Sequence, residues 1–219
     1  MKTVTTLFVV LLIALGAGAQ SYQQPLIPPH ALNVNVVLFG HSWIELMQGF
    51  QPWAFPNIPS RHVAIQGFGG YNCAELLAIV LANVPASTNA VFIMAATNDV
   101  VEGVSVAQHM ACMESMIGEL IGENPHMLIL ISNVPPLCIT VLGVFGDERS
   151  RIAAYNQAYL SLPQLYPNNV KLVDMWTPMV DTNGWGLLNM FRDGVHFGPN
   201  GQDLVMGTIR DSLYANLPQ

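Results

Sequence analysis

Charged residues are scarce in this sequence of 219 residues. They make up 10% of it, with seven Lys and Arg against fourteen Asp and Glu, and the net charge at neutral pH is −7. Nucleic acids and anionic membrane surfaces attract proteins mainly through clustered basic side chains. The chain has no such cluster, so we expect no nucleic-acid partner and no attraction to an anionic membrane surface.

Cysteine is also rare, and the three cysteines show no metal-ligand spacing: Cys73, Cys112 and Cys138. An odd number leaves at least one free thiol in an exported protein. Cys73 and Cys112 could pair, but their spacing does not decide it, and buried, small apolar side chains are the preferred interpretation. Four histidines lack ligand spacing too: His41, His62, His109 and His126. We therefore expect no metal site and no cofactor.

A long apolar run occurs only at the N-terminus. It extends from Leu7 to Gly16, follows Lys2, and is succeeded by the small residues Ala17-Gly18-Ala19. A bilayer-spanning helix needs about 20 apolar residues, so this run is too short to be a membrane anchor. The pattern is typical of a signal peptide. We expect residues 1–19 to be cleaved near Ala19 and the mature chain to be secreted, to a periplasm or the outside, without stable membrane insertion.

The sequence as a whole is 52% hydrophobic, and after the N-terminal run its apolar segments alternate between short and long. Residues 20–33 are rich in Gln and Pro and predict an extended segment before one domain at 34–219. Short apolar runs predict strands at 34–39, 62–66, 90–95, 127–132 and 170–174. Amphipathic runs predict helices at 72–83, 105–122, 148–162 and 199–214. This alternation predicts an α/β fold, a parallel five-stranded sheet covered by helices.

Polar or Gly-rich segments follow these strands, at the edge where ligands bind in parallel sheets. Ser42 follows the first strand within Gly40-His41-Ser42-Trp43, either as a nucleophile or as a simple helix cap. It lacks the Gly-x-Ser-x-Gly elbow, because Ile44 replaces the second glycine. Gly67-Phe68-Gly69-Gly70 follows the second strand, and could expose backbone N–H groups or be a flexible turn.

Ala96-Thr97-Asn98-Asp99 follows the third strand. The Asn98 amide could bind an oxyanion and Asp99 could brace the loop, although an Asx turn would explain both. His196 closes the set within Asp193-Gly194-Val195-His196. An imidazole is the usual general base at neutral pH, and Asp193 could orient it, unless this is only a surface turn. A serine hydroxyl needs such a base to become a nucleophile.

Together these segments resemble the four sequence blocks of the SGNH (GDSL-type) hydrolase superfamily. The likeness extends from about Val34 to Leu213. It is greatest to the lysophospholipase-L1-like esterase branch, which shows the Gly-Phe-Gly-Gly run of 67–70 and the Asp-x-x-Thr-Pro-Met run of 174–179. The resemblance implies a three-layer α/β/α sandwich of flavodoxin-like type and hydrolysis of carboxylic esters.

The resemblance also implies a role for each matching residue. Ser42 would be the nucleophile, His196 its base and Asp193 the partner of that base. The backbone N–H groups of Ser42 and Gly70 and the side chain of Asn98 would form an oxyanion hole. Two positions depart from the family pattern: His41 replaces a frequent Asp, and Ala96 replaces a Gly. Neither change removes a reacting group.

Five residues flanking these motifs are candidates for substrate binding or, equally, for packing: Trp43, Tyr71, Asn72, Trp176 and Val195. We expect the substrate to be a small ester or an acylated saccharide, which makes a carbohydrate O-acetylesterase one alternative. An inactive secreted binding module with the same fold is another. The oligomeric state, the acyl length and the alcohol portion of the substrate are left open.

Overall fold

Five parallel strands form one sheet in the computed structural model, which describes residues 32–48 and 54–217. The strands are β1 (Val36–His41), β2 (Val63–Phe68), β3 (Ala90–Met94), β4 (Leu128–Ser132) and β5 (Val170–Val173). Their spatial order is β2-β1-β3-β4-β5, the flavodoxin-like order. The predicted parallel sheet is confirmed. The expected signal peptide and most of the extended segment at 20–33 lie outside the described residues.

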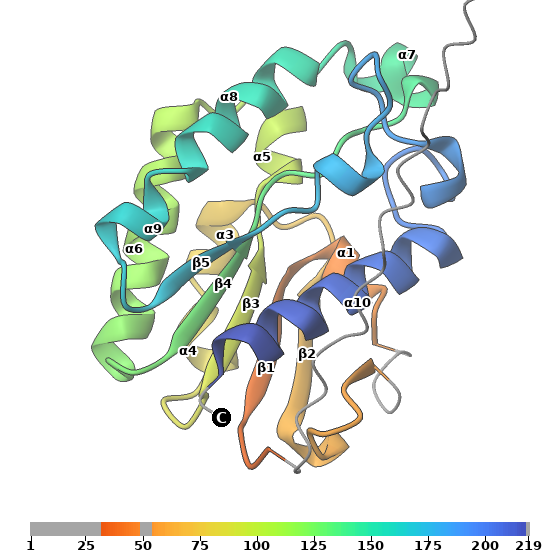
Figure 1. Ribbon diagram of the computed structural model, residues 1–219. Coiled ribbons are helices and arrows are strands. Elements are labelled where there is room, and N and C mark those ends of the chain that lie inside the picture. The colour runs from red at the N-terminus through yellow and green to blue at the C-terminus, as the bar shows by residue number, and fades with distance from the viewer. Residues whose placement is uncertain (1–31, 49–53, 218–219) are drawn as a thin grey trace, which may run out of the picture.

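Helices cover both sides of the sheet. Successive side chains of each strand point to opposite faces, and both sets are apolar, so each face packs against helices. Val36 and Leu38 face a core formed with α1 (Ser42–Glu45) and α10 (Pro199–Asn216), whereas Val37 and Phe39 face the opposite core. Figure 1 shows α10 crossing one side of the sheet close to α1, with helices from the middle of the chain on the other side. That other side carries α3 (Cys73–Leu77), α4 (Val80–Asn83), α6 (Val106–Glu123), α8 (Arg149–Tyr159) and α9 (Leu162–Leu165). The predicted three-layer sandwich is confirmed.

Two helical predictions needed correction. The helix expected at 72–83 is two short helices, α3 and α4, and Asn72 caps the first through a reciprocal capping box with Glu75. The segment after β3, expected to be a loop, begins α5 (Thr97–Glu102), which ends at Gly103 with φ +77°. A left-handed glycine is a common helix terminus. A further short helix, α7 (Leu142–Phe145), follows the 3₁₀ turn Ile139–Val141.

A disulfide joins Cys73 to Cys112, with the two Cα atoms 6.2 Å apart. The preferred interpretation of these two residues as reduced core side chains was therefore wrong. Packing of α3 against α6 brings their Cβ atoms within bonding reach, and sequence spacing does not reveal that packing. Cys138 is a buried free thiol, as expected for at least one cysteine. Among the described residues, no helix is long and apolar enough to cross a membrane.

The first turn after β1 packs directly on β2, and Gly67 makes this close approach possible. A Cβ at Gly67 would overlap the backbone nitrogen of Glu45 in α1. We expect Gly67→Ala to lower the free energy of unfolding by about 3 kcal/mol, because backbone must move to relieve the overlap. Gly118→Ala in α6 is the matched control. A Cβ at Gly118 meets no atom within 4 Å, so this change should stabilise the helix by up to about 1 kcal/mol. Urea unfolding of both variants checks this, and equal midpoints would contradict it.

Candidate active site

Four segments far apart in the sequence meet at the carboxyl edge of the sheet. Ser42 begins α1 directly after β1, Gly70 follows β2, Asn98 lies in the first turn of α5 after β3, and His196 lies just before α10. These four residues line one hollow of about 270 Å³. It lies where the chain crosses from one side of β1 to the other, which is the usual ligand position in such sheets. The other lining residues are His41, Trp43, Thr97, Val101, Phe145 and Val195.

Ser42, His196 and Asp193 form a continuous hydrogen-bonded chain. The Ser42 Oγ atom lies 3.1 Å from Nε2 of His196, and Nδ1 of the same ring lies 2.8 Å from Oδ2 of Asp193. The Asp193 carboxylate accepts a hydrogen bond from the N–H at Nδ1 of His196. In that tautomer Nε2 carries no proton and faces the Ser42 hydroxyl as an acceptor. The arrangement can therefore remove the proton of Ser42 and retain it as an imidazolium.

Asp193 is held in its charged form by the turn that it begins. Its Oδ1 atom accepts hydrogen bonds from the backbone N–H groups of Val195 at 3.0 Å and His196 at 2.7 Å. Partial burial alone would raise the pKa of Asp193, but these bonds and the His196 ring outweigh it and lower the pKa to about 2. Asp193 is thus ionised at neutral pH and can orient the imidazole.

Gly194 allows this turn to pack against the neighbouring segment. Its φ is +89°, and a Cβ there would overlap Thr140 and Val141. The backbone N–H of Cys138 also donates to the Gly194 carbonyl at 2.9 Å. The loop that carries His196 is therefore fixed from the outside by residues 138–141.

Asn98 and Gly70 both line the hollow beside Ser42. The Nδ2 atom of Asn98 donates to the carbonyl of Tyr71 at 2.8 Å, which fixes the orientation of the amide and leaves its second N–H available. Gly70 has a φ of +80°, a left-handed conformation that favours glycine and turns the local backbone sharply between β2 and α3.

The five candidate binding residues have different environments. Val195 lines the hollow and is partly buried, while Trp43 lines it from the core, where its ring packs 4.5 Å from that of Phe197. Tyr71 stacks on Phe68. The side chain of Asn72 caps α3 and donates to Glu102 at 3.0 Å, so it serves to join two helices.

Trp176 lines a different and larger hollow of about 500 Å³, together with Asn133, Asn156 and Asp174. The polar groups there bond to one another and to nearby backbone, such as Asn156 to both backbone atoms of Val134. Ser42 and His196 line the smaller hollow and not this larger one, so the candidate reacting groups lie at the smaller hollow.

Two other reactive side chains near the site are held uncharged. Burial lowers the pKa of His41 to about 3, even though the charge of Asp99 acts to raise it. Burial, assisted by the charge of Asp193, raises the pKa of the Cys138 thiol to about 11. Neither a His41 imidazolium nor a Cys138 thiolate is available at neutral pH, and Ser42 is the candidate nucleophile with an imidazole at hydrogen-bonding distance.

Four lining residues were not anticipated from the sequence: His41, Thr97, Val101 and Phe145. Val101 lies one helical turn after Asn98, and recognition of α5 as a helix would have predicted it. Phe145 belongs to the irregular segment between β4 and α8, and no periodic signal places it at the hollow.

A family model described as the GDSL-like lipase/acylhydrolase family matches residues 39–204. The chain belongs to this family. The resemblance stated above is confirmed, and ester hydrolysis is supported as the general activity of this GDSL-like acylhydrolase. No curated protein sequence matches the chain.

Solved structures share the fold of this GDSL-like acylhydrolase at low sequence identity. A proposed acylhydrolase from Bacteroides fragilis superimposes with a TM-score of 0.74 at 22% identity, covering 88% of this chain and 93% of its own. A GDSL-like lipase from Bacteroides thetaiotaomicron gives 0.72 at 20% identity, covering 84% and 89%. An acetyl xylan esterase gives 0.62 at 16% identity, covering 82% and 100%.

Residues 32–48 and 54–217 contain no group of three His, Cys, Asp or Glu side chains arranged to hold a metal ion.

Proposed function

We propose that this acylhydrolase is a secreted serine esterase, which cleaves carboxylic esters through an acyl-enzyme on Ser42. The observation that carries the proposal is the chain from Ser42 Oγ through His196 to Asp193, with distances of 3.1 and 2.8 Å. A serine with a neutral imidazole at hydrogen-bonding distance is equipped for nucleophilic attack on a carbonyl carbon.

In this mechanism Ser42 attacks the ester carbonyl while His196 Nε2 takes its proton. The resulting tetrahedral intermediate expels the alcohol, which receives that proton from His196. A water molecule then attacks the acyl-enzyme, again giving a proton to His196, and releases the acid and the free Ser42 hydroxyl. Asp193 stays ionised throughout and stabilises the imidazolium.

The oxyanion formed in both steps needs donors placed in advance. The candidates are the backbone N–H groups of Ser42 and Gly70 and the side-chain amide of Asn98, all of which line the hollow beside the nucleophile. Donors aimed at the developing charge stabilise the transition state more than the bound ester, and so raise the rate.

Covalent labelling tests the nucleophile. We expect a fluorophosphonate to modify the wild-type protein once, on the peptide that contains Ser42, and to leave Ser42→Ala unmodified. Ser105→Ala is the matched control, because Ser105 also begins a helix but acts there as a cap hydrogen-bonded to Gln108. Mass spectrometry of the digested protein reads the site. Labelling of Ser42→Ala would place the nucleophile at another residue, whereas an unlabelled wild-type protein would count against the esterase and favour an inactive binding module.

A carbohydrate O-acetylesterase is the second candidate. The hollow beside Ser42 is only about 270 Å³, which suits a small acyl group. One structural neighbour is described as an acetyl xylan esterase. Comparing acetate release from acetylated xylan with cleavage of nitrophenyl esters of increasing acyl length separates the two candidates.

Export is supported by two independent features. Residues 1–19 have the pattern of a signal peptide, and disulfides such as Cys73–Cys112 persist mainly in oxidising compartments. N-terminal sequencing of protein recovered outside the cytoplasm should find Gln20 as the first residue.

A further inference from the structure

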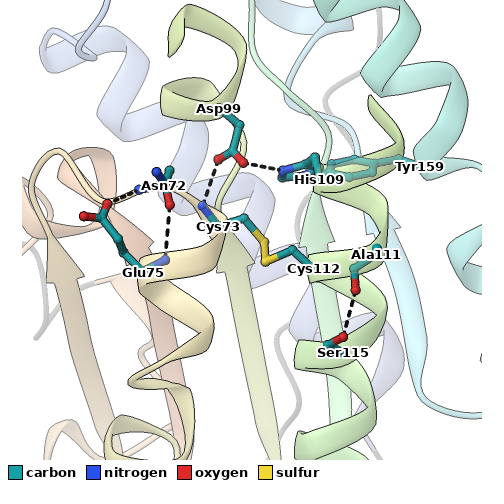
Figure 2. Close-up of a disulfide and its surroundings, with 9 residues drawn as sticks. All are labelled: Asn72, Cys73, Glu75, Asp99, His109, Ala111, Cys112, Ser115 and Tyr159. Atoms are coloured by element: carbon teal, nitrogen blue, oxygen red, sulfur yellow. Dashed lines mark hydrogen bonds and ion pairs between the residues drawn. A yellow bond between two sulfur atoms is a disulfide. The ribbon is translucent and has the colours of Figure 1, made fainter. Parts of the chain in front are cut away.

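Behind the oxyanion side of the hollow lies a buried charged residue that the proposed mechanism does not use. Asp99 is 2% exposed and His109 is fully buried. Figure 2 shows the Asp99 carboxylate between the start of α3 and the His109 ring on α6. A buried carboxylate is costly unless it is paired and hydrogen-bonded, so its partners show what it holds in place.

The carboxylate joins three helices. Its Oδ2 atom accepts a hydrogen bond from the backbone N–H of Cys73 at 2.8 Å, and its Oδ1 atom lies 3.1 Å from Nδ1 of His109. The other ring nitrogen of His109 lies 2.6 Å from the hydroxyl of the fully buried Tyr159. Asp99 in α5 is thereby tied to the first residue of α3 and, through His109, to α6 and α8.

The hydrogen bonds of Asp99 lie next to the two proposed oxyanion donors, Gly70 and Asn98. Asn98 precedes Asp99 in the same helical turn and donates to the carbonyl of Tyr71, while Cys73 donates back to Asp99. Residues 98–99 and residues 71–73 are thus joined by two hydrogen bonds, one donated by each segment to the other. Gly70 immediately precedes Tyr71, so the same pair of bonds sets the spacing between the backbone of Gly70 and the amide of Asn98.

A disulfide also fixes the start of α3, where Cys73 bonds to Asp99, to helix α6. Cys73 forms the disulfide with Cys112, which lies in α6 three residues after His109. Asn72 adds a third tie from α3 to α5 through Glu102. The start of α3 is therefore held by α5 and α6 together, immediately beside the hollow.

We propose that Asp99 is a positioning residue for ester hydrolysis, which holds Gly70 and Asn98 at the spacing that lets both bind one oxyanion. The inference rests on the proposed esterase function. Asp99 reaches no reacting atom and acts only through these two donors. Misplacement of a catalytic group by about 1 Å can cost on the order of a hundredfold in rate.

A double-mutant cycle tests the inference. Asp99→Asn should lower kcat for nitrophenyl acetate by about tenfold with little change in KM, and Asn98→Ala should lower it by about a hundredfold. In the Asn98→Ala background, Asp99→Asn should cost only about threefold or less, because one of the two donors that it positions is already absent. Rates are divided by the concentration of sites that a fluorophosphonate titrates, so that misfolded protein does not count.

Asn169→Ala is the matched control. Asn169 is also a buried polar clamp, donating to the carbonyls of Pro125 and Met127, but it precedes β5 at the opposite edge of the sheet. Its loss should lower stability and leave kcat per titrated site unchanged. His109→Gln provides a second variant if Asp99→Asn folds poorly, because a Gln amide can still donate to the carboxylate. We expect a smaller loss of kcat that is likewise reduced in the Asn98→Ala background.

Effects of Asp99→Asn and Asn98→Ala that simply multiply would overturn the positioning role, as would an unchanged kcat in Asp99→Asn. Hydrolysis that persists in Ser42→Ala would instead refute the proposed function, and the inference with it. The Ser42→Ala measurement therefore separates the two failures.

Discussion

If Ser42 is the nucleophile as proposed, replacing His196 by Ala should lower kcat by about 10⁶-fold, as removal of the base does in a serine protease. The geometry explains why so much depends on one ring. Nε2 of His196 lies 3.1 Å from Ser42 Oγ. Burial lowers the pKa of His41, the other imidazole that lines the hollow, to about 3, so that ring is too weak a base to replace His196.

The measurement is kcat for nitrophenyl acetate, with urea unfolding to show that the fold is intact. His126→Ala is the control, because His126 is exposed and lies near the opposite edge of the sheet, beside Leu128 and Asn89. It should leave kcat unchanged. A loss of less than about tenfold in His196→Ala would show that another group is the base.

The sheet could be predicted because buried parallel strands are continuous apolar runs, such as 90–95 and 127–132. Placement of Ser42 and Asn98 at one edge followed from the same prediction, since the carboxyl ends of parallel strands lie together. This rule places Ser42 and Asn98 directly, whereas His196 lies well beyond the end of β5, just before α10, and its placement at the site came from the family resemblance.

Features that depend on packing between segments could not be predicted in this way. The Cys73–Cys112 disulfide depends on how α3 lies against α6, and the division between α3 and α4 occurs with no Pro or Gly to mark it. Position within a motif also gave a wrong expectation: Trp176 lies inside the matching run 174–179, yet its side chain lines another hollow. Phe145 reaches the site from a segment that matches none of the motifs.

The buried pair Asp99 and His109 illustrates the same limit. Asp99 was expected to brace its loop, and the adjacent Asn98 carried the chemical signal. The partner His109 was only one of several histidines without ligand spacing. Its contact with Asp99 depends on α6 packing beside α5 and α3, which the residue pattern of α6 alone does not specify.

Asp193→Asn is expected to lower kcat by about 10⁴-fold while leaving the fold intact. The Asn side-chain oxygen can still accept the backbone bonds from Val195 and His196. Its amide would then face Nδ1 of His196 as a donor, so the ring would carry its proton on Nε2. In that tautomer the imidazole cannot accept the proton of Ser42.

The lowered pKa of Asp193 predicts how its contribution to stability changes with pH. Asp193 has a folded pKa of about 2, below the ordinary value of 3.8, so its charge stabilises the native turn above about pH 4 and this contribution is lost as pH falls toward 2. The wild-type carboxylate is thus ionised throughout the range above about pH 4, and the deficit of Asp193→Asn should persist across that range.

Asp181→Asn is the matched control for this variant. Asp181 begins a similar turn, accepting from the backbone N–H groups of Asn183 and Trp185, but no histidine follows it. It should leave kcat unchanged, with at most a small loss of stability. If the two substitutions lowered kcat equally, the carboxylate at 193 would be acting only through its turn. A loss confined to Asp193→Asn, with normal urea unfolding, would show that the orientation and tautomer of His196 depend on this charge.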